Sequence, residues 1–434
     1  MRLFYTAICC ILTHLLAAQS YDSYLTGSAT DADVAAQGGI CLMGGATEDD
    51  NAMTWFLQRA NGGDVLVLRA TGSDGYNDYF YTDLGVSLNS VETIIFNDAS
   101  AASDAYVLQQ IAEAEAIWFA GGDQYDYITY WRGTAVDSLI NAGLQQRNIA
   151  IGGTSAGMAI QGGYIFTAQN GTVYSDEALT DPYNQYMTVD STAFFRNDIL
   201  ADVITDTHYD DPDRKGRHVT FLARMLNDYG LTHAKGIALD EYTAACIAPD
   251  GTARIFGGFP TYDDNAYFLQ VNCDLSNPAP ESLASGTPLT WDHNGEAVVV
   301  YSVKGTASGN NTFDLNEWKT GNGGTWQYWS VQNGTLTEAT GNAPDCTTSV
   351  SLSPTAAPFG LTIAPNPVSD MLTVQSSERL VRMSLSDATG RVVRTATDLQ
   401  GFDTTVLVRN LAAGVYFLSV ESATGRAVQR VVIE

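Results

Sequence analysis

The stretch N-I-A-I-G-G-T-S-A-G-M-A-I, residues 148–160, indicates both the fold and the site. It joins an apolar run typical of a buried strand to a G-x-S-x-G turn and then to the apolar start of a helix. Where a strand turns sharply into a helix, the residue at the apex takes a strained backbone conformation, and glycines leave the space that it needs. We therefore expect the Ser155 hydroxyl to stand clear of the backbone, beside the N-terminus of the helix. Alone, the motif is a weak signal, because any glycine-rich turn can contain a serine.

A second glycine turn follows another apolar run upstream. Residues 116–120 are A-I-W-F-A, and G-G-D-Q follows directly at 121–124. Two glycines at the end of a parallel strand let backbone N–H groups face outward, as an oxyanion hole requires. We expect the amides of Gly122 and Ala156 to face the Ser155 hydroxyl. The alternative is that these glycines only make a tight turn.

A candidate base lies downstream of the serine. Of the five histidines, His208 alone ends a strand-like run, residues 199–205, which is followed by D-T-H-Y. An imidazole within hydrogen-bond reach of a serine can take its proton. Because a lone histidine at a strand end is more often structural, this assignment needs further support.

The apolar runs predict a parallel sheet. Residues 39–45, 64–68, 91–96, 116–120 and 148–152 are nearly continuous apolar segments separated by helical patterns. Such strands are typical of an α/β fold whose sheet is covered by helices on both faces. Ligands of these sheets bind at the carboxyl ends of the strands, where both glycine turns would lie.

Four motifs in order resemble those of cyanophycinase and its relatives, the α-aspartyl dipeptidases, over roughly residues 38–258. They are F-A-G-G-D-Q, G-G-T-S-A-G, D-T-H-Y with the arginines that follow it, and G-I-A-L-D-E-Y-T-A at residues 236–244. The resemblance implies a flavodoxin-like fold, also described as class I glutamine amidotransferase-like, and a serine peptidase that cleaves peptide bonds next to aspartate. It implies Ser155 as the nucleophile and His208 as the general base.

The resemblance also implies residues for the rest of the site. Gln124, Arg214 and Arg217 are its candidates for gripping a substrate carboxylate. The family places an acidic residue between the serine and the histidine, to orient the imidazole. We favour Glu177, near the middle of that interval, and leave Asp176 and Asp206 as alternatives.

The chain departs from the family pattern near His208. Thr207 stands where the family usually has glutamine, which removes an amide that could read the substrate backbone. The insertion D-D-P-D at residues 210–213 is a second departure.

Two other kinds of site do not fit the sequence. The interval from Ser155 to His208 is too short for an α/β-hydrolase, and no Lys-Ser/Thr follows the glycines as a phosphate-binding P-loop requires.

Cysteine spacing does not predict a metal site, and we expect no metal or cofactor. Cys41 and Cys246 lie in apolar runs, where a free thiol behaves as a small hydrophobic side chain. Cys273 and Cys346 lie in polar stretches that contain proline, and their pairing in an oxidising compartment is left open.

The N-terminus and the overall charge indicate export. Residues 1–18 have the short basic start, apolar centre and small terminal residues of a secretory signal peptide, and we expect no stable membrane insertion. The net charge of −28 argues against binding to nucleic acid or to an anionic membrane surface. It would attract a cationic substrate such as an arginine-bearing peptide, or it is simply an acidic secreted surface.

We predict a catalytic α/β domain at 19–258, a β-rich extension at 259–350, a linker at 351–358 and a small β-sandwich at 359–434. The extension either completes the catalytic domain or forms an appendage. In the last segment, P-N-P at 365–367, D-A-T-G-R at 387–391 and L-A-A-G-V-Y at 411–416 resemble the C-terminal sorting domain of type IX secretion cargo. This resemblance implies recognition by the type IX secretion machinery and export across the outer membrane of a Bacteroidota cell.

Three hypotheses follow for function. The first is a secreted serine peptidase acting on aspartyl or β-aspartyl peptides, among them the arginine-grafted polyaspartate polymer. The second is a small-peptide aspartyl dipeptidase without polymer activity, which Thr207 favours. The third is a non-catalytic surface protein that keeps the fold as a binding platform.

Overall fold

The computed structural model describes residues 19–191, 194–346, 360–387, 392–397, 399, 401–422 and 425–433. The expected signal peptide and the expected linker lie outside these residues. The chain divides between residues 348 and 349 into two compact units. Among the described residues, none of the helices combines the length and the apolar character needed to span a bilayer.

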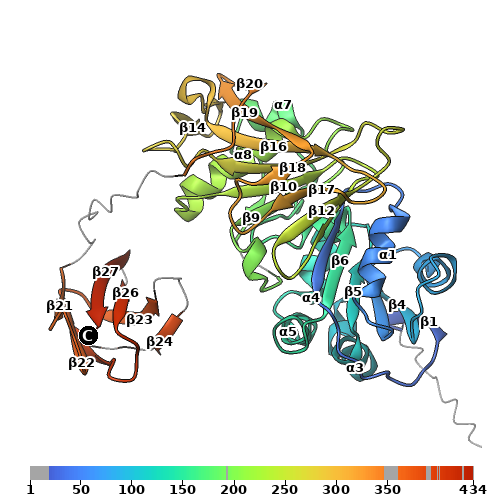
Figure 1. The fold of residues 1–434 in the computed structure, drawn as a ribbon, viewed down its shortest axis with the longest axis horizontal. Helices are drawn as coiled ribbons and strands as arrows, with labels where there is room; N and C mark the ends of the chain where they lie inside the picture. The colour runs from blue at the N-terminus through green and yellow to red at the C-terminus, as the bar shows by residue number, and fades with distance from the viewer. Residues whose placement is uncertain are drawn as a thin grey trace, which may run out of the picture. The chain divides into compact units, whose positions relative to one another are not determined.

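The N-terminal unit contains two large sheets, and the first of them has ten strands (Figure 1). Its order is β1-β4-β3-β5-β6-β2-β11-β12-β17-β18, and β4, β3, β5, β6 and β2 run parallel. The bounds are β1 (Tyr21–Gly27), β2 (Gly39–Met43), β3 (Asp64–Arg69), β4 (Ser90–Phe96), β5 (Ala116–Phe119), β6 (Ala150–Thr154), β11 (Ala244–Ile247), β12 (Thr252–Phe256), β17 (Asn311–Asp314) and β18 (Gly321–Asn322).

Helices cover both faces of the parallel part of this sheet. Alternate strand residues such as Leu42 and Leu68 join one core with α3, α4 and α5, while their neighbours Met43 and Val67 join another core with α1. Because β5 and β6 are buried throughout, their sequences are nearly free of polar side chains, whereas β4, buried as fully, also encloses Ser90, Glu92 and Thr93. This confirms the predicted fold class. The helices are α1 (Asp50–Gln58), α2 (Gly75–Asp78), α3 (Ala105–Glu113), α4 (Gln124–Trp131), α5 (Ala135–Ala142), α6 (Ala156–Ala159), α7 (Ser175–Thr180) and α8 (Lys215–Tyr229), with the short turns η1 (Tyr79–Asp83), η2 (Ala99–Ser103), η3 (Gly143–Arg147), η4 (Asp198–Leu200) and η5 (His293–Gly295).

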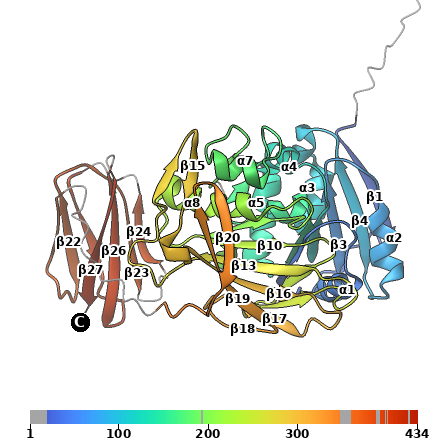
Figure 2. The ribbon, with the colours of Figure 1, turned by 90° about the horizontal axis from the view of Figure 1, so that it is seen from above.

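A second sheet of six strands completes the N-terminal unit, in the order β20-β19-β16-β13-β10-β9 (Figure 2). Strands β9 and β10 are parallel and are joined through α8, while the other neighbours are antiparallel. Between residues 259 and 346, β13, β16, β19 and β20 extend this sheet, β17 and β18 extend the first sheet, and β14 and β15 form a separate pair. The bounds are β9 (Val203–Asp206), β10 (Lys235–Leu239), β13 (Asn265–Val271), β16 (Val298–Lys304), β19 (Gly324–Gln332) and β20 (Thr335–Thr340), and the small pairs are β7 (Ile165–Phe166) with β8 (Val189–Asp190) and β14 (Ser282–Ala284) with β15 (Thr287–Thr290).

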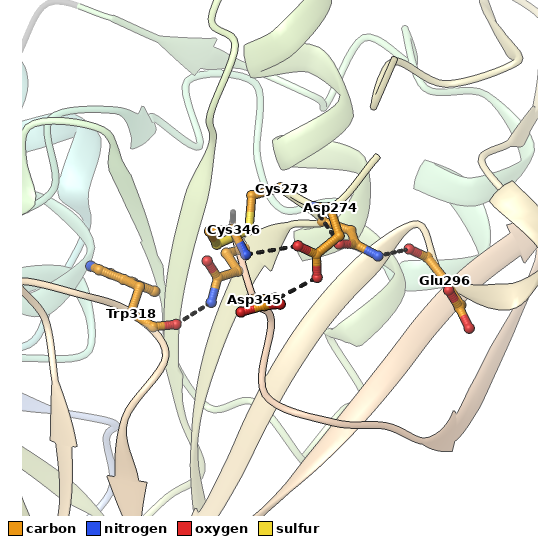
Figure 3. The surroundings of a disulfide bond; sticks show 8 residues. Cys273, Asp274, Glu296, Trp318, Asp345 and Cys346 are labelled. Carbon is orange, nitrogen blue, oxygen red and sulfur yellow. Dashed lines mark hydrogen bonds between the residues drawn. A yellow bond between two sulfur atoms is a disulfide. The ribbon is translucent and has the colours of Figure 1, made fainter. Parts of the chain in front are cut away.

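A disulfide joins Cys273, just after β13, to Cys346 near the end of the unit. Figure 3 shows Asp274 beside it, whose carboxylate accepts the N–H groups of Asp345 at 3.0 Å and Cys346 at 2.7 Å. Closing a loop across 73 residues of sequence stabilises the folded state by about 4 kcal/mol in the chain-entropy account. Cys41 and Cys246 are free and buried, on directly paired positions of β2 and β11.

The C-terminal unit is a small β-sandwich. A three-stranded sheet, β21-β22-β25, and a four-stranded sheet, β24-β23-β26-β27, enclose a core that includes Leu372, Val374, Leu385, Leu418 and Val431. The bounds are β21 (Leu361–Ala364), β22 (Met371–Ser376), β23 (Leu380–Asp387), β24 (Val392–Thr397), β25 (Asp403–Leu407), β26 (Gly414–Ser422) and β27 (Gly425–Ile433).

Candidate active site

Ser155 lies at the apex of the turn between β6 and α6. Its backbone has φ 52° and ψ −117°, a conformation that costs a residue with a side chain on the order of 1–3 kcal/mol. The glycines beside it allow close packing against β5. A side-chain carbon on Gly157 would lie 2.0 Å from the carbonyl oxygen of Phe119, and one on Gly153 would lie 2.5 Å from the backbone of Gly157. The geometry is that of a nucleophile elbow.

The Gly121-Gly122 turn, which follows β5, lies next to Ser155. A side-chain carbon on Gly121 would be 3.7 Å from Cβ of Ser155, whereas one on Gly122 would point at the Tyr127 hydroxyl, 2.8 Å away. Ala156, the first residue of α6, directly follows the serine. Gly122, which the sequence suggested, therefore shares its turn with Gly121, and Gly121 faces the serine more closely.

His208 reaches the serine from the second sheet. It comes two residues after β9, and its Nε2 lies 2.9 Å from Ser155 Oγ. Two contacts to the turn after β2 hold it there. Its backbone N–H donates to the Gly44 carbonyl at 2.9 Å, and the ring packs on Gly45 so closely that a side-chain carbon there would lie 2.3 Å from it. Only glycine at position 45 leaves room for the imidazole.

The acid beside His208 is Glu241. It comes two residues after β10, and its Oε1 lies 2.5 Å from Nδ1 of His208. Its backbone N–H donates to Asp210 at 3.3 Å, and the next residue, Tyr242, donates to the Gly45 carbonyl at 3.3 Å. The two loops that carry the histidine and the glutamate are therefore tied to the same glycine turn.

The expectation that Glu177 would fill this position is corrected by the geometry. Glu177 lies in the first turn of α7, where its carboxylate accepts the backbone N–H of Tyr174 at 3.0 Å and caps the helix. Asp176 lies in the same helical turn, and Asp206 pairs with Arg217.

The prediction from sequence missed Glu241 because this residue lies outside the interval between the serine and the histidine in which the acid was expected. The signal that could have found it is the motif at 236–244, to which Glu241 belongs. Since β9 and β10 are adjacent and parallel, residues just after both strands meet at one edge.

Arg217, one of the predicted carboxylate-binding residues, is enclosed in the protein. It is only 3% exposed, and its guanidinium forms a two-point ion pair with Asp206. Its Nη1 also donates to Thr172 and to the carbonyl of Val173. Burial alone would raise the pKa of Asp206, but the guanidinium outweighs it and holds that pKa below its usual value. The ion pair joins α8 to the end of β9 and leaves the guanidinium little capacity for a ligand.

The other predicted binding residues are partly engaged as well. Thr207 is 5% exposed, and its carbonyl accepts a hydrogen bond from Arg214 Nη1 at 2.8 Å. Arg214 is half-buried, and burial lowers its pKa. Gln124, at the start of α4, is half-buried and donates to the carbonyl of Phe166 at 3.3 Å. The structure does not gather these side chains into one open group.

Two further titratable groups lie near the second sheet. Asp240, directly before Glu241, has a pKa raised to about 7, chiefly by burial and also by the nearby charges of Asp210 and Asp264. Its Oδ2 accepts the backbone N–H of Asn265 at 2.8 Å. His218 is buried in α8, and burial lowers its pKa to about 4, so that it is neutral at physiological pH.

Three carboxylates form the group of described residues that could hold a metal ion. Oxygens of Asp31, Asp64 and Glu115 lie within 4.8 Å of one another. Asp64 begins β3 and Glu115 directly precedes β5, so the cluster lies at the opposite end of the strands from Ser155. Glu115 accepts the backbone N–H of Asp64 at 2.8 Å, and burial together with the two aspartates raises its pKa to about 7. The cluster is remote from the serine.

Two family descriptions match the chain. Peptidase family S51 matches residues 67–253, a range that includes Ser155, His208 and Glu241, and the secretion system C-terminal sorting domain matches residues 362–434. Both resemblances drawn from the motifs are thereby confirmed. The region that matches family S51 begins inside β3. The Gly44-Gly45 turn, which contacts His208, therefore lies outside the matched region.

Curated relatives carry the name cyanophycinase. Those of Synechococcus elongatus and Thermosynechococcus vestitus are each 26% identical over 257 residues, which cover 55% of this chain and 73% of theirs. That of Trichormus variabilis is 22% identical over 167 residues, covering 38% and 50%.

Solved structures include a peptidase from an acI-B1 Actinobacterium, with 12% identity, a TM-score of 0.39 and coverage of 64% of this chain and 97% of that one. They also include a putative peptidase E protein from Listeria monocytogenes EGD-e, with 14% identity, a TM-score of 0.32 and coverage of 51% and 98%.

Proposed function

We propose that this chain, a serine-type peptidase that contains a peptidase family S51 domain and a secretion sorting domain, hydrolyses aspartyl or β-aspartyl peptides with a Ser155–His208–Glu241 triad. The sorting domain indicates secretion or cell-surface localisation through the type IX system. The observation that carries the proposal is the continuous pair of hydrogen bonds from Ser155 Oγ to His208 and from His208 to Glu241.

The geometry supports a specific sequence of proton transfers. His208 Nε2 takes the proton of Ser155 Oγ as the oxygen attacks the peptide carbonyl carbon. Glu241, at Nδ1, holds the imidazole in the right tautomer and stabilises its protonated form. His208 then gives the proton to the leaving amine, and water attacks the acyl-enzyme in a second round that frees the serine.

The negative oxygen of the tetrahedral intermediate needs N–H donors next to Ser155. Ala156, at the start of α6, and Gly122, with its neighbour Gly121, are the groups we propose for this oxyanion hole. Donors already in place before the reaction need no reorganisation when the charge develops, and loss of one such donor costs roughly 100- to 1000-fold in kcat.

The substrate is proposed from the names of the relatives and from the charge of the chain. The cyanophycinase relatives favour aspartyl or β-aspartyl bonds, and the net charge of −28 favours a substrate with cationic groups, such as the arginine-grafted aspartyl polymer. Thr207 favours the second candidate, an aspartyl dipeptidase without polymer activity, because it stands where the family that the chain resembles usually has glutamine and so lacks an amide that could bind the backbone of an extended substrate.

Mass spectrometry of the released products tests the proposal. The N-terminal unit is incubated with the polymer, with β-Asp-Arg and with α-aspartyl dipeptides. The Ser155→Ala variant is treated in the same way, and Ser138→Ala, which changes an exposed serine of α5, is the matched control. We expect hydrolysis of at least one substrate by the unsubstituted and Ser138→Ala proteins and none by Ser155→Ala. Equal turnover by Ser155→Ala would refute the assignment, and turnover restricted to dipeptides would decide for the second candidate.

A further inference from the structure

A cavity of about 320 Å³ lies at the carboxyl end of the sheet and has no part in the triad. Its wall is formed by the segment that follows β2, by the end of β3 and by the segment around α2. The residues that matter here are Glu48, Arg69, Tyr76 and Tyr79.

Strand register places this cavity close to the catalytic serine. Leu68 is paired with Phe119 on β5, and Phe119 is paired with Gly153 on β6. The next residue, Arg69, is therefore level with Thr154, the residue before Ser155, two strands away. Two strand spacings correspond to roughly 10 Å between their backbones, a distance that one substrate residue and an arginine side chain together can span.

Two of the segments that line the cavity lead to the catalytic turns. Glu48 follows Gly45, the residue on which the His208 ring packs, by three positions. On the β3 side, a side-chain carbon on Gly122 would lie 3.9 Å from the Thr71 hydroxyl, in the loop that directly follows Arg69. The segments that line the cavity therefore run next to the glycine turns around Ser155.

Arg69 belongs to a chain that has 49 acidic and 21 basic residues, and among the described residues it shares the lack of a close ion pair with Arg59, Arg214 and Arg254. Arg132, Arg217 and Arg224 each pair with an aspartate. Within the part of the chain that the structure describes, Arg69 has no carboxylate within 4.0 Å.

Its hydrogen bonds hold the guanidinium without neutralising it. Nε donates to the Thr71 carbonyl at 2.5 Å and Nη1 to the Ser73 carbonyl at 2.7 Å. Of its five N–H donors these use two. Two acidic side chains, Glu48 and Asp50, line the same cavity. Glu48 accepts a hydrogen bond from the Tyr76 hydroxyl, and Asp50 accepts one from the Tyr79 hydroxyl at 2.8 Å.

We propose that Arg69 binds a carboxylate of the peptide substrate. Three N–H donors of the guanidinium remain for a carboxylate. Glu48 in the same wall attracts the guanidinium at longer range but, among the described residues, no carboxylate forms a close ion pair with it. Arg217, which the sequence offered for this task, is closed off by Asp206. The proposal rests on the proposed peptidase function, and two carboxylates qualify: the side chain of an aspartyl residue or the C-terminus of a short peptide.

Binding to a protein that cannot turn over tests the proposal apart from catalysis. Calorimetry compares Ser155→Ala with the double variants Ser155→Ala/Arg69→Gln and Ser155→Ala/Arg69→Lys. The probes are an aspartyl dipeptide, its asparaginyl counterpart and its C-terminal amide. Arg254→Gln, at an exposed position of β12, is the matched control.

Loss of a charge-assisted pair weakens binding by roughly 10- to 100-fold, and we expect this for Arg69→Gln with the acidic dipeptide. Lysine should recover part of the affinity, and Arg254→Gln should leave it unchanged. If the affinity for the asparaginyl probe does not change with Arg69, the arginine binds the side-chain carboxylate. If the affinity for the C-terminal amide does not change, it binds the C-terminal carboxylate. Equal affinity of the Arg69→Gln and Arg69 proteins for all three probes, or no measurable binding of any probe, would overturn the proposal. Failure of the proposed function is distinct: it would appear as absent turnover by the unsubstituted enzyme even where binding depends on Arg69.

Discussion

Replacing Glu241 by glutamine separates the triad seen in the structure from the one suggested by the sequence. Glutamine keeps the size of the side chain but turns one carboxylate oxygen into an amide that can donate to His208 Nδ1. The imidazole would then carry its proton on Nε2, which lies 2.9 Å from Ser155 Oγ and could no longer accept the serine proton.

The expected magnitude follows from this change of tautomer. An aspartate-to-asparagine change at the matching position of a serine protease triad lowers kcat by about 10⁴-fold, and that is the scale expected here. In barrier terms this is about 5 kcal/mol, far more than a surface hydrogen bond contributes. Folding should change little, because Glu241 is half-exposed and its backbone contacts remain.

Glu177→Gln is the matched control. Glu177 caps α7 through a single hydrogen bond to Tyr174, so its loss should cost about 1 kcal/mol of stability or less and leave kcat near that of the unsubstituted protein. The assay is kcat/KM on the substrate found active, with the thermal midpoint of each variant measured alongside. A large fall in kcat for Glu177→Gln with little change for Glu241→Gln would refute the reasoning.

Three other substitutions test parts of the same structure. Arg217→Leu leaves the Asp206 carboxylate buried without its ion-pair partner, with only the Thr207 N–H, among the described residues, still donating to it, and should destabilise the fold by about 3–5 kcal/mol in denaturant titration. An unchanged midpoint with lost activity would indicate direct substrate contact instead. Gly45→Ala places a methyl group 2.3 Å from the His208 ring, so we expect kcat to fall at least tenfold while far-UV circular dichroism is unchanged; normal kcat would contradict the packing. Burial raises the folded pKa of Glu115 to about 7, above its unfolded value. The folded state therefore binds a proton at Glu115 more readily, and this residue contributes more stability at pH 5 than at pH 8. Glu115→Gln should remove this pH dependence, so a stability difference between variant and parent that is the same at pH 5 and pH 8 would contradict it.

The fold was largely predictable from local patterns. Strands buried on both faces must be apolar at nearly every position, and the run before Ser155 shows this directly in the sequence. The elbow was predictable for a similar reason, since G-x-S-x-G before a helix has few other uses when a strand precedes it. The sandwich strands of the C-terminal unit also follow from simple alternation.

The acid and the binding residues depend on pairings that no local pattern reports. Glu241 reaches His208 because β9 and β10 are neighbours, and the chain between them forms α8. Arg217 looks like a free cation in the sequence, and only the packing of α8 against β9 shows that Asp206 occupies it. Arg69 ends an ordinary strand, so its open guanidinium becomes visible only when the cavity is assembled.

The most direct test of the central claim is to locate the residue that a serine-directed phosphonate modifies. The full N-terminal unit is treated with the reagent, digested and sequenced by mass spectrometry, with His208→Ala and Glu241→Gln treated in parallel. The Ser155–His208–Glu241 arrangement predicts a single stoichiometric adduct on Ser155 that forms much more slowly in both variants. An adduct on another serine, or labelling of Ser155 at the same rate without His208, would contradict it.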